Sequence, residues 1–411
     1  MSYTKTQLRQ TFRSLHLRTS PNADVAATTV TLQRADEVVM DNGESVLDWD
    51  DLSAIITTAG AGGLDTGAEA ASTRYEIWAI RKSSDGTKNL LLHRAKNFSA
   101  DTSFTTATDA QRALRLSTGT ATDKLAQGIQ FSNSDVFHYI DVKLIRAGAV
   151  SGRVWFSIQA SSGGDADAVA LATTDKIDAA VISTSEENIR IIFRVPTTPS
   201  AATQYHLVLE GDYTKSDTVY IAWRGVAAGG YGSGVAREYN GTTWANASGV
   251  GDFNFQAYIT RNDAAVTMPS GYDQKCKIGY VYNDSGSNFD PFVASDRFVQ
   301  AYEIQATATI TATVPTLIDI SAFIPPGALE VEVAFWNGTS SAFSAVAGVP
   351  NGYDASAGSG SDPSAAGYVI NRTPAAVNAV WTYASLITEF QGLYGSVGSG
   401  TMNLQVTGYR W

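Results

Sequence analysis

Apolar and polar residues alternate with a period of two through most of the chain, which is typical of β-strands that bury one face. Residues 75–80 alternate in this way and lead through an Asp-Gly turn at residues 84–86 to a second apolar run at residues 89–93. Because Asp-Gly supplies the positive φ of a tight turn, the two runs predict a β-hairpin. Residues 277–282 form a similar run, and we expect it to be a neighbouring strand of the same sheet, separated by an insertion.

A self-contained block of short strands lies between these two parts, at residues 105–260. The runs are joined by turns rich in Gly, Asn and Ser. They cover residues 126–131, 137–146, 152–159, 189–195, 205–210, 219–223 and 252–259. Seven or eight short strands of this kind are what an antiparallel β-sandwich needs, so the block predicts an inserted sandwich.

The start of the chain has a different pattern. Leu8, Phe12 and Leu15 recur at spacings of four and three, which predicts a short amphipathic helix over residues 5–18 that stops before Pro21.

The end of the chain returns to strand patterning. Residues 304–411 alternate again, and their last run, residues 403–411, is too aromatic for a free tail, so we expect it to be packed. Residues 349–367 contain mostly Gly, Ser, Ala, Asp and Pro, which predicts a long surface loop. Strand edges in this region have little protection by Lys or Pro, which favours a homo-oligomer, with a trimer as the expected form.

The predicted fold is therefore all-β, with antiparallel sandwich domains. Its parts are residues 1–24 as a basic N-terminal segment, 25–104 with 261–303 as a discontinuous base, 105–260 as the inserted sandwich, and 304–411 as a C-terminal β domain.

Composition agrees with this fold and excludes several function classes. Only 17% of the 411 residues are charged, and the net charge of −11 repels a phosphate backbone, so we expect no nucleic acid partner. No apolar run is long enough for a transmembrane helix. The single cysteine, Cys276, excludes an intrachain disulfide and is expected to be a buried apolar residue.

The N-terminal segment is a basic exception in an acidic chain. Lys5, Arg9, Arg13 and Arg18 occur there without any acidic residue. Four like charges on a terminus suggest an anchor that docks on an acidic partner. A basic disordered tail is the alternative interpretation.

Several segments resemble virion structural proteins of tailed bacteriophages. They are residues 63–67, 75–80, 268–272, 278–286 and 291–292, together with the inserted block, which is similar to the jelly-roll modules of phage tail and fibre proteins. The resemblance covers about residues 60–300 and carries over no catalytic residue.

The resemblance implies a structural component of the virion that is assembled in the host cytoplasm. A tail appendage or fibre-like protein with a glycan-facing sandwich is the main expectation, with other virion proteins and a host surface glycan as partners. A capsid decoration or head fibre is one alternative, and a tail spike that depolymerises polysaccharide is another. We expect no enzyme activity and no cofactor.

Candidate chemistry in the sequence is sparse. The four histidines are scattered at residues 16, 93, 138 and 206, and none has metal-ligand spacing to another histidine or to the cysteine. Asp165 with Asp167, and Glu186 with Glu187, are acidic pairs in turns, where solvated residues or a weak calcium site are both possible interpretations. We therefore predict no metal site and no catalytic residue.

Aromatic residues are the remaining functional signal, because exposed rings stack on the flat faces of sugars. Tyr231, Tyr239 and Trp244 lie in a Gly- and Asn-rich context outside the alternating runs. These three residues are the candidates for glycan contact.

Overall fold

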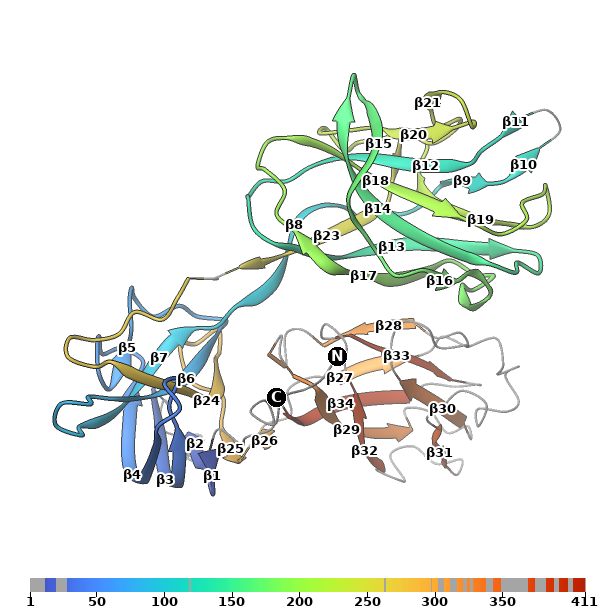
Figure 1. The fold of residues 1–411 in the computed structure, drawn as a ribbon. Coiled ribbons are helices and arrows are strands. Elements are labelled where there is room, and N and C mark those ends of the chain that lie inside the picture. Colours follow the sequence, from blue (N-terminus) through green and yellow to red (C-terminus); the bar gives the residue numbers. More distant parts are fainter. Residues whose placement is uncertain are drawn as a thin grey trace.

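The fold is described from a computed structural model of the chain. It covers residues 12–19, 28–117, 120–261, 264–296, 298–301, 307–310, 316–320, 324–325, 328–337, 343–348, 369–373, 382–387, 392–397 and 402–410. Across these ranges every regular element is a strand, apart from one 3-10 turn at Ala179–Val181, and nearly all strand pairs are antiparallel. The predicted all-β class is confirmed, and Figure 1 shows the sheets grouped into three bodies.

The base is built from two sheets that enclose a common core. One sheet contains β1 (Phe12–Arg13), β2 (His16–Thr19), β3 (Thr29–Val39), β4 (Ser45–Ile55), β25 (Phe292–Ser295) and β26 (Phe298–Ala301). The other contains β5 (Gly63–Leu64), β6 (Thr73–Arg81), β7 (Lys88–Arg94) and β24 (Gln274–Asn283). Leu32, Trp49, Ile77 and Leu92 are fully buried between them.

The base confirms two predictions made from sequence. Strands β6 and β7 form the predicted hairpin, and β24 pairs with β6 along its length although the whole inserted block separates them. Gly86 has a φ of +74°, as the tight turn requires.

The N-terminal helix prediction is wrong for the described residues. Residues 12–19 form β1 and β2, which pair with β3 in the base sheet. Ser14 has a φ of +52°, a left-handed kink that places Phe12, Leu15 and Leu17 together in the core. The spacing of apolar residues therefore reflects an irregular strand, and these residues belong to the base.

The inserted sandwich contains two layers. One sheet contains β8 (Asn97–Phe104), β9 (Ala110–Leu114), β13 (Phe137–Ala147), β17 (Glu187–Thr197), β19 (Tyr220–Val226), β22 (Asp252–Phe253) and β23 (Phe255–Arg261). The other contains β12 (Lys124–Gln130), β14 (Arg153–Ser162), β15 (Asp165–Thr173), β16 (Ile177–Asp178), β18 (Gln204–Gly211), β20 (Ala236–Tyr239) and β21 (Trp244–Asn246). A short hairpin of β10 (Leu116–Ser117) and β11 (Thr120–Ala121) lies beside them.

Strand order identifies the sandwich as a jelly roll. Its framework strands in chain order are β8, β12, β13, β14, β15, β17, β18 and β23. The first, eighth, third and sixth of them form one sheet, and the second, seventh, fourth and fifth form the other. Successive framework strands alternate between the two sheets except for β14 and β15, which pair in one sheet, and this is the double Greek-key order of a jelly roll.

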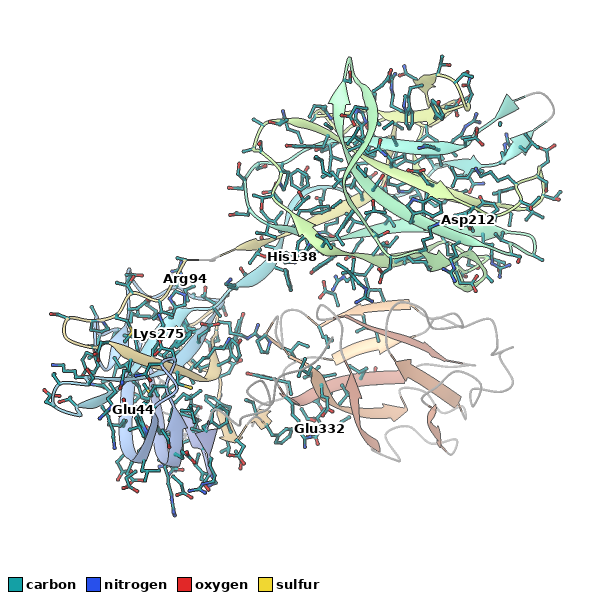
Figure 2. All side chains as sticks on the ribbon, viewed as in Figure 1. Glu44, Arg94, His138, Asp212, Lys275 and Glu332 are labelled. Atoms are coloured by element: carbon teal, nitrogen blue, oxygen red, sulfur yellow. The ribbon has the colours of Figure 1, made fainter. Side chains whose placement is uncertain are left out.

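The sandwich is joined to the base by two adjacent connections. Strand β7 ends at Arg94 and β8 begins at Asn97, which pairs directly with Arg261 at the end of β23. The inserted unit therefore begins near residue 97 rather than at residue 105. Figure 2 labels Arg94 at the base end of this connection and His138 on the sandwich side.

The C-terminal region adds a second, smaller sandwich. Strands β27 (Thr307–Ile310), β29 (Glu330–Asn337), β32 (Thr382–Ile387) and β34 (Met402–Arg410) form one layer, and β28 (Thr316–Asp319), β30 (Phe343–Gly348), β31 (Val369–Thr373) and β33 (Gly392–Val397) form the other. Strand β34 pairs with β26, so the first layer continues the base sheet. Leu404 and Val406 are buried, which confirms that the last strand is packed. The predicted loop at residues 349–367 lies outside the described residues.

Candidate functional site

Tyr239 and Trp244 form a partly exposed aromatic pair at the edge of the sandwich. They are direct cross-strand partners on β20 and β21, and their ring centroids are 5.2 Å apart at an interplanar angle of 46°. Asn240 fixes the turn between them, because its Oδ1 accepts hydrogen bonds from the backbone N–H groups of Thr242 and Thr243 at 2.9 and 2.8 Å. Both rings are only partly buried. The strand pairing and the Asn240 turn hold them in a fixed arrangement.

The pair lies on the outer face of its sheet. Trp244 packs against Ala126 and Val208, whose strand neighbours Leu125 and Leu207 point into the core of the sandwich. Because successive residues of a strand face opposite sides, this contact places the Trp244 ring on the solvent side of the sheet.

Polar side chains surround the aromatic pair. Arg237, on the same hairpin as Tyr239, donates from Nε to Oδ1 of Asp165 at 2.9 Å and from Nη1 to Oδ1 of Asn246. This ion pair ties the β20–β21 hairpin to the tip of the β14–β15 hairpin. Asp165 thus binds an arginine, and Asp167 accepts from the backbone N–H of Val169.

Two buried polar groups lie on neighbouring strands of this sheet. Gln159 on β14 and His206 on β18 are register partners, and each is 2% exposed. Burial, helped by the charge of Arg237, lowers the pKa of His206 to about 4, so its imidazole is neutral near pH 7. Its Nε2 lies 3.3 Å from Oγ of Ser161.

Tyr231 has a packing role instead. Its ring contacts Phe104 and Phe255, and its hydroxyl group lies 2.7 Å from Oγ1 of Thr102 and accepts from the backbone N–H of Gln130 at 3.1 Å. The structure therefore separates Tyr231 from the other two glycan candidates and places it between the sheets.

The candidate anchor residues are only partly described. Arg13 on β1 and Arg18 on β2 are exposed on the base. Lys5 and Arg9 lie outside the described residues. Both visible arginines are therefore carried by strands of a packed sheet.

A buried ion pair beside the connections was not predicted from sequence. His93 on β7 lies 2.7 Å from Asp65 through Nδ1 and Oδ2, and Asp65 also accepts from the backbone N–H of Thr267 at 3.1 Å. Burial alone would lower the pKa of His93, but Asp65 outweighs it and the pKa is raised. The pKa of Asp65 is lowered, because the hydrogen bonds from His93 and Thr267 outweigh its burial. The pair thus fastens the returning chain to the base.

A second unpredicted network connects the two sandwiches. Arg190 is fully buried and binds Asp141 through two hydrogen bonds of 2.9 and 2.8 Å. Its Nη2 also reaches Asp319 on β28 of the C-terminal sandwich at 3.1 Å. The guanidinium group lies over the rings of Tyr139 and Tyr258, 4.4 and 5.3 Å from their centroids. Burial would lower the pKa of Arg190, but the bonds to Asp141 reverse the direction and raise it.

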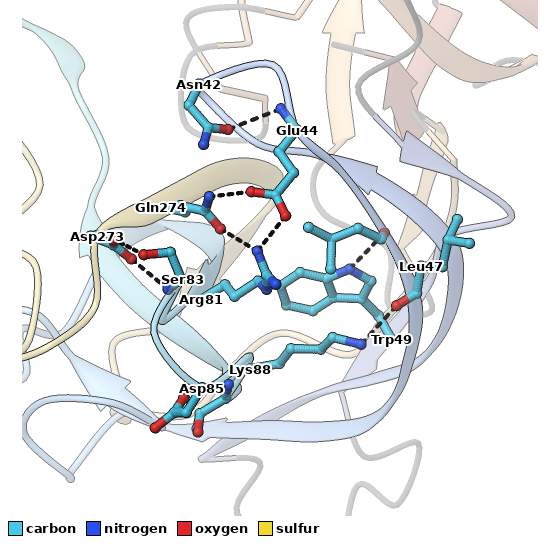
Figure 3. Close-up of polar contacts among 12 residues, drawn as sticks. Asn42, Glu44, Leu47, Trp49, Arg81, Ser83, Asp85, Lys88, Asp273 and Gln274 are labelled. Carbon is cyan, nitrogen blue, oxygen red and sulfur yellow. Dashed lines mark hydrogen bonds and ion pairs between the residues drawn. The ribbon is translucent and has the colours of Figure 1, made fainter.

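A third network stiffens the base (Figure 3). Arg81 donates from Nη1 to Glu44 at 2.7 Å and to Gln274 at 2.8 Å, which links β6 to β24 and to the residue preceding β4. Lys88 donates to the backbone carbonyl groups of Leu47 and Asp48 at 2.7 and 2.9 Å. These contacts all lie within the base and connect its strands to one another.

Comparison with known proteins does not assign the chain. The sequence matches no protein-family model and no curated protein. In the described ranges, no group of three or more His, Cys, Asp or Glu side chains could hold a metal ion. The same part of the chain contains no helix with the length and hydropathy needed to cross a bilayer.

Proposed function

We propose that the protein is a structural component of a tailed-phage particle, a tail appendage or fibre-like protein whose inserted jelly roll binds a host surface glycan. The observation that carries the proposal is the aromatic pair, held on the outer face of a jelly roll that the base displays through two adjacent connections. Rigid aromatic rings provide apolar contact area at little entropic cost, which suits the flat faces of sugar rings.

The surroundings of the aromatic pair support a sugar ligand. Arg237, Asp165 and Asn246 lie next to the rings and carry hydrogen-bond donors and acceptors suited to hydroxyl groups. The ion pair between Arg237 and Asp165 balances their charges, so the site favours a neutral ligand over a charged one. Binding and attachment, without bond cleavage, is the role that this set of residues fits.

The proposal is tested by binding of the full chain to bacterial capsular polysaccharides and lipopolysaccharide O-antigens on an array. Trp244→Ala is expected to weaken binding about tenfold or more, because one stacking surface is lost. The matched control is Trp155→Ala, since Trp155 also lies partly exposed on this sheet but contacts Lys176 instead. Equal loss in both variants, or no binding by the folded wild-type chain, would contradict a glycan role for the pair.

The structural part of the proposal has independent tests. Immunogold labelling of intact particles is expected to place the protein on the tail, and labelling of the head would instead support a capsid decoration. New reducing ends after incubation with a bound polysaccharide would show a depolymerase and refute the non-enzymatic role. A homotrimer is part of the proposal, and light scattering at micromolar concentration measures it.

A further inference from the structure

A buried histidine, His206, lies on the sheet face where the β14–β15 and β20–β21 hairpins are joined. Its side chain is on the outer face of β18, because Val208, two residues further along the strand, packs against Trp244 on that face. His206 is nevertheless only 2% exposed. On the same face Nε of Arg237 donates to Oδ1 of Asp165 at 2.9 Å, and this ion pair, called the clasp below, joins the two hairpins.

The hydrogen-bonding surroundings of His206 suit a neutral imidazole. Nε2 lies 3.3 Å from Oγ of Ser161, whereas Nδ1 is buried and has no hydrogen-bond partner in the described part of the chain. The register partners of His206 are Gln159 on β14 and Gly128 on β12, so neither strand places a carboxylate directly opposite the ring. A protonated imidazole has two N–H donors, and one of them would be buried here without an acceptor, which is costly.

Three charged side chains act on the imidazole, and they come from the two joined hairpins. Arg237 on β20 disfavours protonation of His206, whereas Asp165 and Asp167 on β15 favour it. Burial is the largest influence, and together with Arg237 it lowers the pKa of His206 to about 4. Because Asp165 already binds Arg237, it can neutralise a protonated imidazole only by giving up the guanidinium group.

The β20–β21 hairpin is weakly held apart from the clasp. Strand β21 is the last strand of its sheet and pairs with β20. The turn between the two strands is exposed. The apolar cluster that receives Trp244 is small and consists of Ala126, Ala166 and Val208. Loss of the clasp therefore removes a large part of what keeps the hairpin on the sheet.

We infer that His206 is an acid-sensitive latch, in which protonation of the imidazole breaks the clasp and releases the β20–β21 hairpin that carries Tyr239 and Trp244. The inference goes beyond the proposed function, because it concerns the movement of the hairpin and holds whatever the aromatic pair binds.

Proton uptake couples this opening to pH. With the hairpin closed, His206 stays neutral down to about pH 4, whereas an imidazole exposed to water by opening titrates near pH 6.5. The open state therefore binds more protons than the closed state as the pH falls below 6.5. Between pH 7.5 and pH 5.5 the equilibrium constant for opening is expected to rise about tenfold.

The test is hydrogen–deuterium exchange of the full chain, followed by mass spectrometry at pH 7.5 and pH 5.5. The protection factor of the β20 amides, corrected for the intrinsic exchange rate, is expected to fall about tenfold at the lower pH. His206→Gln removes the titrating group and keeps an amide that can reach Ser161, so its β20 amides should lose this pH dependence. His138→Gln is the matched control, because His138 is a partly buried histidine on the opposite sheet whose pKa is also lowered. This variant should respond to pH as the wild type does.

Asp165→Asn tests the clasp without changing the histidine. It is expected to lower the protection of β20 at pH 7.5, because Arg237 loses its ionic partner. The amides of β13, in the opposite sheet, report unfolding of the whole jelly roll. Equal protection of β20 and β13 at each pH would show that the hairpin opens only when the whole domain unfolds, which would overturn the inference. A wild-type pH response in His206→Gln, or wild-type protection in Asp165→Asn, would overturn it as well.

Discussion

Replacing Arg190 with leucine is expected to destabilise the inserted jelly roll strongly. The side chain of Arg190 is fully buried and that of Asp141 is 13% exposed, so the substitution leaves a carboxylate with little access to water and no cationic partner. Breaking a buried ion pair in this way costs about 3–5 kcal/mol of unfolding free energy. For a domain of this size, about 2–4 °C is lost per kcal/mol, which predicts a melting temperature about 6–20 °C lower.

Two comparisons identify the cause of that loss. Asp319→Ala removes only the partly exposed partner, with its side chain 39% exposed, and is expected to cost about 1 kcal/mol or less. The Arg190→Leu, Asp141→Leu double variant removes both buried charges and is expected to be more stable than Arg190→Leu alone.

Scanning calorimetry of the full chain measures these effects, with each transition assigned by near-ultraviolet circular dichroism. If Asp319→Ala is as destabilising as Arg190→Leu, the contact between the two sandwiches carries the stability and the reasoning from the buried pair is refuted. The reasoning is also refuted if the stability lost by the double variant equals the sum of the losses measured for Arg190→Leu and for Asp141→Leu separately.

Two further predictions concern the jelly-roll core and the connections. Tyr213→Phe is expected to lower the unfolding free energy by about 2 kcal/mol, because the buried hydroxyl donates to the carbonyl of Leu114 at 2.7 Å and accepts from the N–H of Ile221 at 2.8 Å. Urea unfolding checks this, with Tyr272→Phe in the base, where the ring is only partly buried, as a control that should change little. The His93–Asp65 pair is expected to stabilise the base most between about pH 4 and pH 6.5, since its contribution is lost as pH rises through the raised pKa of His93 and as pH falls through the lowered pKa of Asp65. The melting-temperature difference between wild type and His93→Gln should therefore be larger at pH 5.5 than at pH 9, and a difference independent of pH would contradict this assignment.

The sequence predicted those strands and turns whose signal lies in adjacent residues. The β6–β7 hairpin follows from alternation and from one Asp-Gly turn, and both are properties of adjacent residues. The N-terminal segment failed for the opposite reason, because a single kink at Ser14 turned an irregular strand into apparent helical spacing.

The candidate sites were harder to predict because they depend on contacts between distant residues. Asp65 and His93 are 28 residues apart, and Arg190 and Asp319 are 129 apart, so no spacing rule indicates either pair. Tyr239 and Trp244 are neighbours in the structure because a short hairpin holds both. Tyr231 occurs in a similar local context, but its partner Thr102 comes from a remote strand and places the ring inside the sandwich.

The direct pairing of Asn97 with Arg261 has a consequence for how such a protein can diversify. Cross-strand partners are about 4.5–5.5 Å apart, so the chain leaves the base and re-enters it at almost the same point. A different domain whose two ends lie equally close could replace the entire jelly roll without altering the path of the base strands. Recombination at these two junctions would exchange the jelly roll for another domain in a single step, while the base strands stay the same.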